Sequence, residues 1–478
     1  MDKKPVENCI QKLKNTAKKE LRKSKYEAGM AAISACAQIL YHYNQYYMDG
    51  TLEELVGELA SIVEIPADFV AEDNTVLFYD GFGLDLRGWA ASFVKALSSG
   101  GYNLIYVTTK DSANKIPHVQ RELGNNNAAY LNMNHYVSHV NELNGVFVKY
   151  RPKAAFFYTL PNDVAGAVVF RAYEGKVRRI QIDLTDHAFW LGVKSADLFL
   201  ESRDLGARIA IHKRGILQEN IVCMDCAPYI ARDICNIPLP FDIESERYVF
   251  SGGALYKTLG DPELLYYKAL REMLRADSEV KFLYAGYGDT RQMKLLQKDY
   301  PNRVFLIGER PDFFRLIENS VFFFNTYPMF GGLMMRYSAL AGKLPITLKH
   351  DEDADNMLFH QKELGIEFEG YDDFIAEIKR VLKDVDYRKA KELRMRGSVM
   401  SDESFKRNLS TLIEEGKTEY CFGELDPVNT KRFRKEYLER FDYWRNMANV
   451  IITRKNRMLI KNFPDLFLKK AIYRLTRR

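Results

Sequence analysis

The sequence has few cysteines and no long apolar run. Six cysteines in 478 residues are too sparse for a disulfide framework, so we expect a reducing compartment. The most apolar early segment, residues 28–41, is interrupted by Ser34 and Gln38. It has neither the compact apolar core of a signal peptide nor the roughly 20 apolar residues of a membrane-spanning helix. These shortages argue against a disulfide-stapled secreted domain and an integral membrane protein, and they favour a cytoplasmic protein.

Positive charge is concentrated in one part of the chain. Residues 429–478 contain fifteen Lys/Arg and four Asp/Glu, which gives this segment a net charge of +11. Because the whole chain has a net charge of +5, the other 428 residues have a net charge of −6. Basic and apolar residues alternate in this tail, which predicts helices with one basic and one apolar face. Such helices would lie on an anionic membrane surface or pack on the body. Nucleic acid fits least, because no stacking module or reading helix is recognisable.

The first 72 residues show helical spacing of apolar residues. A helical hairpin is expected over residues 5–48, broken near Ser24-Lys25, and a further helix over 52–63. No residue pattern in this segment points to catalysis. We therefore interpret residues 1–72 as a helical appendage for docking or oligomerisation.

Residues 73–240 have the pattern of an α/β domain. Val76 to Asp80 form a short apolar strand that is followed directly by glycines, then a helix over 89–97 and a strand over 102–108. This order is one βαβ unit. Further strands are expected at 154–160, 179–184 and 197–201, and the proline-dense residues 238–240 are interpreted as a hinge.

Residues 241–420 repeat the alternation of strands and helices. Strands are expected at 248–250, 280–285, 304–307, 321–324 and 344–348, and helices at 262–274, 290–298, 313–317, 331–341, 355–363 and 372–383. Such alternation requires a mostly parallel sheet whose ligands collect at the carboxyl ends of the strands. The fold class predicted is α/β, with two facing Rossmann-like domains, an N-terminal helical appendage and a basic helical tail over 421–478.

Two glycine-rich landmarks lie in the second of these domains. Ser251-Gly252-Gly253 forms a small-residue turn after a strand, and Lys257 follows shortly after; Gly331-Gly332-Leu333 opens a helix. Backbone N–H groups at a glycine turn and at a helix start bind phosphates, and the helix dipole adds positive potential. We predict a nucleotide-diphosphate site here, with Lys257 neutralising the diphosphate. The alternative is that Lys257 is an exposed lysine at a helix start.

The first domain offers two weaker candidates. His187 follows a predicted buried strand beside Asp186, where it would act as a general base on an acceptor hydroxyl or hydrogen-bond the donor sugar. The alternative is a histidine satisfied by backbone groups near the hinge. Asp80, Gly81 and Gly83 form a strand-end turn that would contact acceptor or phosphate, or would be a tight βα turn without a ligand.

No metal site is expected. Cys223 and Cys226 form one cysteine pair, with Cys235 and His212 nearby, whereas a structural zinc site needs two properly spaced pairs. The acidic run 351–353 is interpreted as a solvated turn.

Across about residues 74–415, the order of these motifs resembles glycosyltransferases of the GT-B architecture, which bind a nucleotide sugar mainly on the C-terminal Rossmann domain. Gly252-Gly253 with Lys257 is similar to the family's diphosphate-holding strand, turn and lysine. The run 254–257 followed by Asp261-Pro262 resembles the protein O-GlcNAc transferase branch in particular. Four further stretches resemble family motifs: 305–310 with Gly308 and Arg310 for the nucleotide base, 325–332 and 341–345 for the phosphate-facing helix and the next strand, and 186–190 for a histidine in the cleft.

One position departs from the family's pattern. Members carry a carboxylate on the glycine-headed helix to hold the nucleotide ribose, and Tyr337 stands at the matching place. Either Asp351, Glu352 or Asp355 on the following loop holds the ribose, or nucleotide binding is weakened or lost.

The resemblance implies a metal-independent glycosyltransferase that needs no cofactor and uses a nucleotide sugar, a UDP-sugar, as donor. The acceptor implied is a cell-envelope glycan, a glycolipid or a protein, and the basic tail suggests a peripheral position on the inner face of the membrane. A non-catalytic GT-B subunit that stabilises or recruits a partner glycosyltransferase is the alternative, and a nucleotide-sugar epimerase is a third interpretation.

Overall fold

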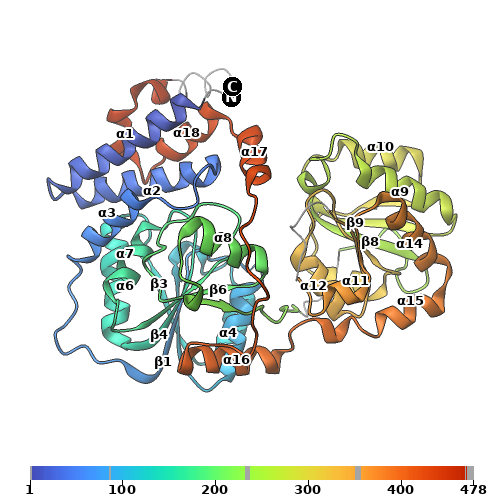
Figure 1. Ribbon diagram of the computed structural model, residues 1–478, viewed down its shortest axis with the longest axis horizontal. Helices are drawn as coiled ribbons and strands as arrows, with labels where there is room; N and C mark the ends of the chain where they lie inside the picture. Colours follow the sequence, from blue (N-terminus) through green and yellow to red (C-terminus); the bar gives the residue numbers. More distant parts are fainter. Residues whose placement is uncertain (1–2, 86–87, 232–236, 350–356, 469, 471–478) are drawn as a thin grey trace. The chain divides into compact units, whose positions relative to one another are not determined.

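A computed structural model describes residues 3–85, 88–231, 237–349, 357–468 and 470 of the chain. Its contacts divide the chain into two compact units. The first unit consists of residues 1–225 and 405–478, and the second of residues 226–404 (Figure 1). The helical appendage and the basic tail therefore both belong to the first unit.

The first unit is built on a seven-stranded parallel sheet with strand order β3-β2-β1-β4-β5-β6-β7. The buried middle parts of its central strands, such as residues 76–79 of β1 and 154–157 of β4, are apolar because helices cover both faces, as is usual for parallel sheets. The strands are β1 (Glu72–Asp80), β2 (Asn103–Thr109), β3 (Asn127–Leu131), β4 (Pro152–Tyr158), β5 (Arg178–Ile182), β6 (Leu198–Glu201) and β7 (Ile221–Cys223); the helices between them are α4 (Trp89–Ser99), α5 (Pro117–Leu123), α6 (Tyr136–Tyr150), α7 (Val164–Ala172) and α8 (Asp204–Arg214).

Three N-terminal helices and the tail pack together on this unit (Figure 1). They are α1 (Lys4–Leu21), α2 (Tyr26–Tyr43) and α3 (Gly50–Ala60), joined by α17 (Lys431–Arg440), α18 (Tyr443–Ile451) and the 3₁₀ segment η7 (Arg457–Asn462). Phe441, Met447, Ile451 and Leu459 of the tail are buried in the same core as α1 and α2. The apolar face of the tail is thus used in packing, which was one of the three alternatives for this segment.

The second unit contains a six-stranded parallel sheet with strand order β10-β9-β8-β11-β12-β13. Its strands are β8 (Tyr248–Ala254), β9 (Lys281–Tyr287), β10 (Val304–Leu306), β11 (Phe323–Phe324), β12 (Pro345–Leu348) and β13 (Glu367–Phe368); its helices are α9 (Leu265–Ala276), α10 (Arg291–Asp299), α11 (Phe313–Asn319), α12 (Gly332–Leu340), α13 (Gln361–Leu364), α14 (Tyr371–Lys383) and α15 (Val385–Glu392). Helix α16 (Asp402–Glu415) spans the boundary back to the first unit.

The two parallel sheets confirm the predicted α/β class with two Rossmann-like domains. The prediction missed β3, β7 and β13, which lie at sheet edges; β7 and β13 have three and two residues. It also ended one strand too early: β8 continues through Gly252 and Gly253, which pair with Ala285 and Gly286 of β9. None of the described helices combines the length and the apolar character that a membrane crossing requires.

Candidate functional site

The candidate site of the second unit lies where the strand order changes direction. The chain starts at β8, proceeds to β9 and β10 on one side, and then returns to β11, β12 and β13 on the other. In open parallel sheets, ligands bind outside the carboxyl ends of the two strands at this switch point. The exits of β8 and β11 are therefore the places where a ligand would be expected in this unit.

Glycines keep the exit of β8 free of side chains. Gly253 has φ +126°, a conformation that L side chains rarely adopt. A Cβ on Gly252 would lie 2.9 Å from the Ala285 carbonyl oxygen, and a Cβ on Gly286 would overlap the Gly253 carbonyl oxygen. Glycine is therefore required at 252 and 286 by the close approach of the two strand ends, and at 253 by the backbone angle. As a result, the main chain at the exit of β8 carries no side chains at these positions.

Lys257 follows in the 3₁₀ segment η4 (Leu255–Thr258) and is half-buried. Its ammonium nitrogen donates to the Phe330 carbonyl oxygen at 3.4 Å, and its own carbonyl accepts from the Met329 N–H at 3.2 Å. These contacts hold the lysine against the loop that leads into α12. The two glycine landmarks, about 80 residues apart in sequence, are thereby brought together, with the cation between them.

Asn325 organises the loop after β11. Its buried side-chain oxygen accepts from the backbone N–H of Thr326 at 2.9 Å and of Gly331 at 2.8 Å, while its amide nitrogen donates to Thr347 at 3.0 Å. One side chain thus ties the start of α12 to the exits of β11 and β12. This pre-organises the loop without a ligand.

Helix α12 begins at Gly332, with Gly331 at the N-cap. The first turn of a helix presents unpaired N–H groups and the positive end of the helix dipole, which together favour an anion. A Cβ on Gly332 would overlap the methyl group of Met357, so this glycine accommodates a neighbouring side chain. Leu333 is half-buried and packs on the core around Phe250 and Tyr337.

Three further predicted contact residues lie at different depths. Ser251 is fully buried, and its hydroxyl accepts from Tyr266 at 2.8 Å. Gly308 has φ +72° and an open surrounding. Arg310, by contrast, is buried and forms two hydrogen bonds with Asp312 at 2.7 and 2.8 Å and one with the Ile237 carbonyl at 2.9 Å. Because its guanidinium anchors the 237–238 segment, Arg310 has a structural role in this unit.

Tyr337, at the position expected for a ribose-binding carboxylate, is part of the core. Its hydroxyl donates to the Tyr229 carbonyl at 2.7 Å, and its ring packs edge-on against Phe313 at 4.8 Å. Burial raises the pKa of this phenol. The tyrosine therefore joins the segment after residue 226 to α12. The alternative ribose ligands Asp351, Glu352 and Asp355 lie outside the described residues.

In the first unit, Asp186 orients His187. The His187 Nδ1 lies 3.0 Å from one Asp186 carboxylate oxygen, and Arg203 pairs with both oxygens of the same carboxylate. Burial opposes ionisation of Asp186, but the charge and hydrogen bonds of Arg203 and the contact with His187 lower the pKa of the carboxyl. An ionised Asp186 favours the tautomer with hydrogen on Nδ1 and leaves Nε2 as an acceptor. The imidazole is 34% exposed.

The appendage and the tail both support this histidine loop. Asn44, in a left-handed conformation at the end of α2, donates to the His187 carbonyl at 3.1 Å and accepts from the Phe189 N–H at 3.2 Å. The ring of His187 lies 6.1 Å from Phe433 and 6.2 Å from Tyr437 of α17. Segments from both ends of the chain therefore position one candidate residue.

A buried charged cluster beside His187 was missed by the sequence analysis. Its charged members are Asp183, Glu201 and Arg214, and Trp190 packs with them. The indole N–H of Trp190 donates to Asp183 at 3.0 Å. The Arg214 guanidinium lies 3.6 Å from the Asp183 carboxylate and 4.9 Å from the Trp190 ring. Burial and the charges of Asp183 and Asp186 raise the pKa of Glu201 well above its ordinary value. Its surroundings therefore favour the protonated form of Glu201. Acidic residues at the ends of two predicted strands, 179–184 and 197–201, were the available signal.

Asp80 is used inside its own turn. One carboxylate oxygen accepts from the N–H groups of Phe82 and Gly83 at 2.9 Å each, and the other accepts from Tyr106 at 2.6 Å. A Cβ on Gly81 would overlap the Thr159 hydroxyl, and Gly83 has φ +57°. Burial raises the pKa of Asp80 to about 6. These contacts describe a closed βα turn.

Of the cysteine pair, Cys223 is half-buried and Cys226 is buried. Burial raises the pKa of Cys223 to about 12, which opposes the thiolate form that metal binding requires. The Nε2 atom of His212 lies 2.7 Å from the Leu425 carbonyl oxygen, and Cys235 lies outside the described residues. Within the described ranges, no group of three or more His, Cys, Asp or Glu side chains is placed to hold a metal ion.

Comparisons with known proteins support the fold. No protein-family model and no curated protein sequence matches the chain. Among solved structures, it is similar to a protein described as a UDP-N-acetylglucosamine 2-epimerase from Listeria monocytogenes, with TM-score 0.53, 12% identity, and coverage of 72% of this chain and 96% of that one. It is also similar to an O-GlcNAc transferase mutant from Thermobaculum terrenum, with TM-score 0.51, 13% identity, and coverage of 86% of this chain and 78% of that one. A glycosyltransferase from Rickettsia africae is similar with TM-score 0.52, 11% identity, and coverage of 71% of this chain and 98% of that one. The chain thus has the GT-B fold, which nucleotide-sugar glycosyltransferases and UDP-N-acetylglucosamine 2-epimerases share.

Proposed function

We propose that this chain is a glycosyltransferase that moves a sugar from a UDP-sugar to an acceptor of the cell envelope, either a glycan or a glycolipid. A protein acceptor is the second possibility, because residues 254–257 resemble the O-GlcNAc transferase branch. The observation that carries the proposal is Lys257, which the fold holds between the glycine-lined exit of β8 and the start of α12.

This arrangement suits a departing nucleoside diphosphate. Glycosyl transfer breaks the bond between the sugar and the diphosphate, so negative charge grows on the leaving phosphate oxygen. Lys257 donates to a neutral carbonyl at 3.4 Å, and a phosphate oxygen is a stronger acceptor for an ammonium group. The lysine, the amides near Gly253 and the first turn of α12 would stabilise that charge, so we propose that no metal is required.

His187 is proposed as the polar group of the first unit that meets the substrates. With Nδ1 directed to Asp186, its Nε2 is available to accept a proton from an acceptor hydroxyl or a hydrogen bond from the donor sugar. Which of these roles it has depends on whether the reaction inverts or retains the anomeric configuration. Asp186 and Arg203 are positioning residues in this scheme.

The direct test is product analysis by mass spectrometry. The full chain is incubated with a mixture of UDP-, GDP- and CMP-sugars and an envelope glycan extract, and the released nucleotide is identified. The proposal predicts UDP and an acceptor heavier by one sugar. A Lys257→Ala variant that releases UDP at the wild-type rate would refute the role of the lysine.

Tyr337 favours a second candidate, a non-catalytic GT-B subunit that stabilises or recruits an active partner. The side chain that would hold the ribose in active relatives is here a buried tyrosine bonded to Tyr229. This candidate predicts that neither UDP nor UDP-sugars raise the melting temperature, and that Lys257→Ala leaves the output of the pathway unchanged.

The similarity to the Listeria protein makes an epimerase a third candidate. An epimerase converts the nucleotide sugar without any acceptor and without release of UDP. Omission of the acceptor from the assay therefore separates the two enzymes: a transferase loses its product, and an epimerase does not.

A further inference from the structure

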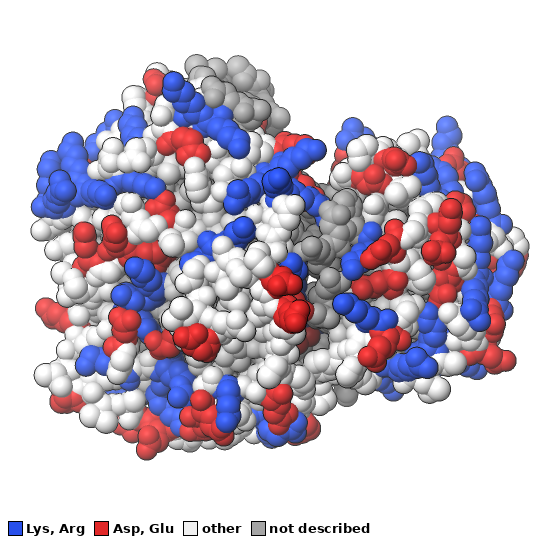
Figure 2. Space-filling model, viewed as in Figure 1, with Lys and Arg blue, Asp and Glu red and all other residues white. Residues whose placement is uncertain are grey.

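Every exposed charged residue of α1 and of the turn that follows it is basic. Residues 3–25 contain nine Lys/Arg, and eight of them are exposed: Lys3, Lys4, Lys12, Lys18, Lys19, Arg22, Lys23 and Lys25. Figure 2 shows Lys and Arg side chains gathered over this part of the first unit. We call these eight residues the α1 basic face. This charge lies outside the basic tail that the sequence analysis singled out.

The acidic residues of the same stretch are turned inward. Glu7 accepts hydrogen bonds from the hydroxyls of Tyr43 at 2.9 Å and Tyr46 at 3.1 Å, and Glu20 is only 6% exposed. The ninth basic residue, Lys14, pairs with Asp49. Both carboxylates within residues 3–25 therefore lie outside the exposed α1 basic face.

The apolar side of α1 is already occupied. Val6, Ile10, Leu13 and Ala17 are buried in the core of the first unit, where they pack with α2 and the tail. The helix consequently offers charge but no apolar face, so it would adsorb to an anionic surface without inserting. Any apolar anchoring has to come from a neighbouring segment.

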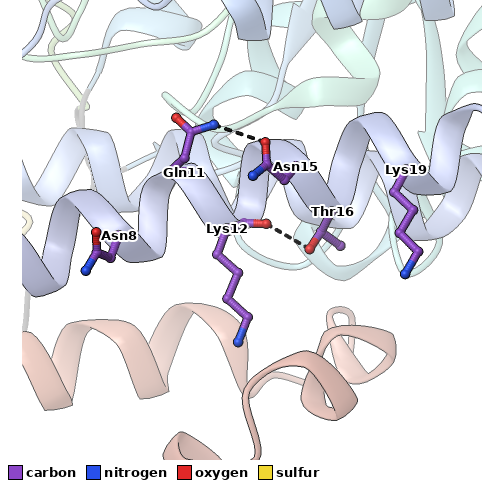
Figure 3. Close-up of a pocket in the computed structure, with 6 residues that line it drawn as sticks. All are labelled: Asn8, Gln11, Lys12, Asn15, Thr16 and Lys19. Carbon is purple, nitrogen blue, oxygen red and sulfur yellow. Dashed lines mark hydrogen bonds between the residues drawn. The ribbon is translucent and has the colours of Figure 1, made fainter.

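The tail supplies such a segment beside α1. Asn8, Gln11, Lys12, Asn15, Thr16 and Lys19 line a hollow of about 410 Å³ along the helix (Figure 3). Asn8 and Lys12 also line an adjoining hollow of about 400 Å³, whose other wall includes Trp444 and Leu466 of the tail. The Lys12 ammonium lies 4.6 Å above the Phe463 ring, which joins the two segments.

Apolar side chains of this tail segment remain exposed. Trp444 is 45% exposed, and Phe467 and Leu468, which follow Leu466 directly, are 45% and 59% exposed. Tryptophan and phenylalanine beside lysine are typical of protein surfaces that settle at the headgroup level of a bilayer. A soluble polyanion or nucleic acid would account for the basic residues but gives no reason for exposed Phe467 and Leu468.

We propose that the α1 basic face, with Trp444, Phe467 and Leu468 at its edge, docks the protein on an anionic lipid bilayer. The charge of the face is complementary to acidic headgroups, and each basic residue near such a surface adds attraction. The proposal extends the envelope part of the proposed function and does not depend on sugar transfer.

The test is sedimentation of the full chain with vesicles of phosphatidylcholine containing 30% phosphatidylglycerol. We expect binding that falls as salt rises, and no binding to pure phosphatidylcholine. The triple variant Lys18→Glu, Lys19→Glu, Lys23→Glu should lower vesicle partitioning by roughly 100-fold, at about one decade or somewhat less per charge. The matched control is Lys294→Glu, Lys298→Glu, Lys362→Glu on exposed lysines of the second unit, which should bind as the wild type does.

A second variant, Trp444→Ser, separates lipid docking from simple anion binding. We expect it to weaken vesicle binding several-fold and to leave binding to soluble polyphosphate or a DNA oligomer unchanged. Equal loss in the control triple, or binding to polyphosphate or DNA without binding to vesicles, would overturn the proposal. UDP binding by the α1 triple variant, measured in parallel, shows whether the second unit is intact, so failure of docking and failure of the proposed function are distinguishable.

Discussion

The exits of β8 and β1 occupy equivalent places in two sheets of the same strand order, yet they are built differently. Both are the first strand of their sheet, flanked by the second and the fourth. At β8, glycines leave bare main chain, and the half-buried Lys257 donates to a carbonyl at 3.4 Å. At β1, the Asp80 carboxylate accepts three hydrogen bonds from within the unit, and Thr159 and Ser112 occupy the space beside Gly81 and Gly83.

The difference shows that topology alone does not make a binding site. A G-x-G sequence after a strand, as at Gly81-Phe82-Gly83, is compatible with a turn whose polar groups satisfy one another. An anion site needs in addition donors that are weakly engaged and a nearby cation. Fold indicates where a ligand would bind, and the side chains at that place decide whether one does.

Removal of the cation at β8 should have the largest effect. We expect Lys257→Ala to lower kcat/KM for sugar transfer by about 10²- to 10³-fold, the range found when one transition-state donor is lost. Lys257→Arg should recover part of the loss, because the charge is kept. Steady-state assays measure kcat/KM for these variants, with Lys294→Ala as the control. An unchanged kcat/KM in Lys257→Ala would show that the exit of β8, like that of β1, does not contribute to sugar transfer.

A methyl group between β8 and β9 should be the next largest change. The Cβ of Gly286→Ala would overlap the Gly253 carbonyl oxygen, so the backbone has to move, and we expect a loss of about 3 kcal/mol in the free energy of unfolding. Gly57→Ala in α3 is the matched control: nothing lies within 4 Å of its Cβ, so alanine should stabilise the helix by about 0.5–1 kcal/mol. Urea denaturation of both variants measures the change in the free energy of unfolding. Equal changes in Gly286→Ala and Gly57→Ala would show that the close approach of β8 and β9 does not require glycine at position 286.

At β1, the comparison predicts a structural role for Asp80. Asp80→Ala removes the acceptor of three hydrogen bonds, and we expect it to cost about 2–3 kcal/mol, whereas Asp80→Asn keeps an oxygen for the two amides and should cost less. The folded pKa of about 6 lies above the unfolded value, so the folded state binds the proton more tightly. Wild-type stability should therefore fall by about 2 kcal/mol between pH 4 and 7 relative to Asp80→Asn.

Chemical denaturation at several pH values tests this. A constant difference between wild type and Asp80→Asn from pH 4 to 7 would contradict the burial of an ionisable group in the turn. Loss of UDP binding in Asp80→Asn, with stability retained, would instead indicate a ligand contact at β1.

Much of the fold was predictable because apolar strands and glycine-ended helices alternate regularly. Lys257, Gly253 and Gly332 were also predictable as a group, since a strand exit and a helix start in one Rossmann unit meet at the same edge of the sheet. The edge strands β7 and β13 were not, because segments of three and two residues have no periodicity to detect.

The sequence also could not show which charged residues pair with distant parts of the chain. Arg310 was a candidate for nucleotide contact, but its carbonyl partner Ile237 lies 73 residues away. The cluster of Asp183, Glu201 and Arg214 likewise forms only when β5, β6 and α8 pack together. Local pattern predicts elements, whereas these partnerships depend on tertiary contacts.

The smallest effect is expected at this cluster. Because burial and the neighbouring carboxylates favour the protonated form of Glu201, glutamine is a close substitute, and Glu201→Gln should change the free energy of unfolding by less than about 1 kcal/mol at pH 6. A raised folded pKa gives stability that is lost as pH rises through it, so the variant should become more stable than the wild type in alkaline solution. Thermal melts from pH 6 to 10 measure the difference; parallel curves would show that Glu201 is ionised.

A calorimetric titration of UDP into the full chain and into Lys257→Ala, with Lys294→Ala as the control, shows directly whether Lys257 helps to bind a nucleoside diphosphate. We expect saturable binding of one UDP per chain, about 10- to 100-fold weaker in Lys257→Ala and unchanged in Lys294→Ala. Absence of binding by the folded wild type, or equal affinity in wild type and Lys257→Ala, would contradict this expectation.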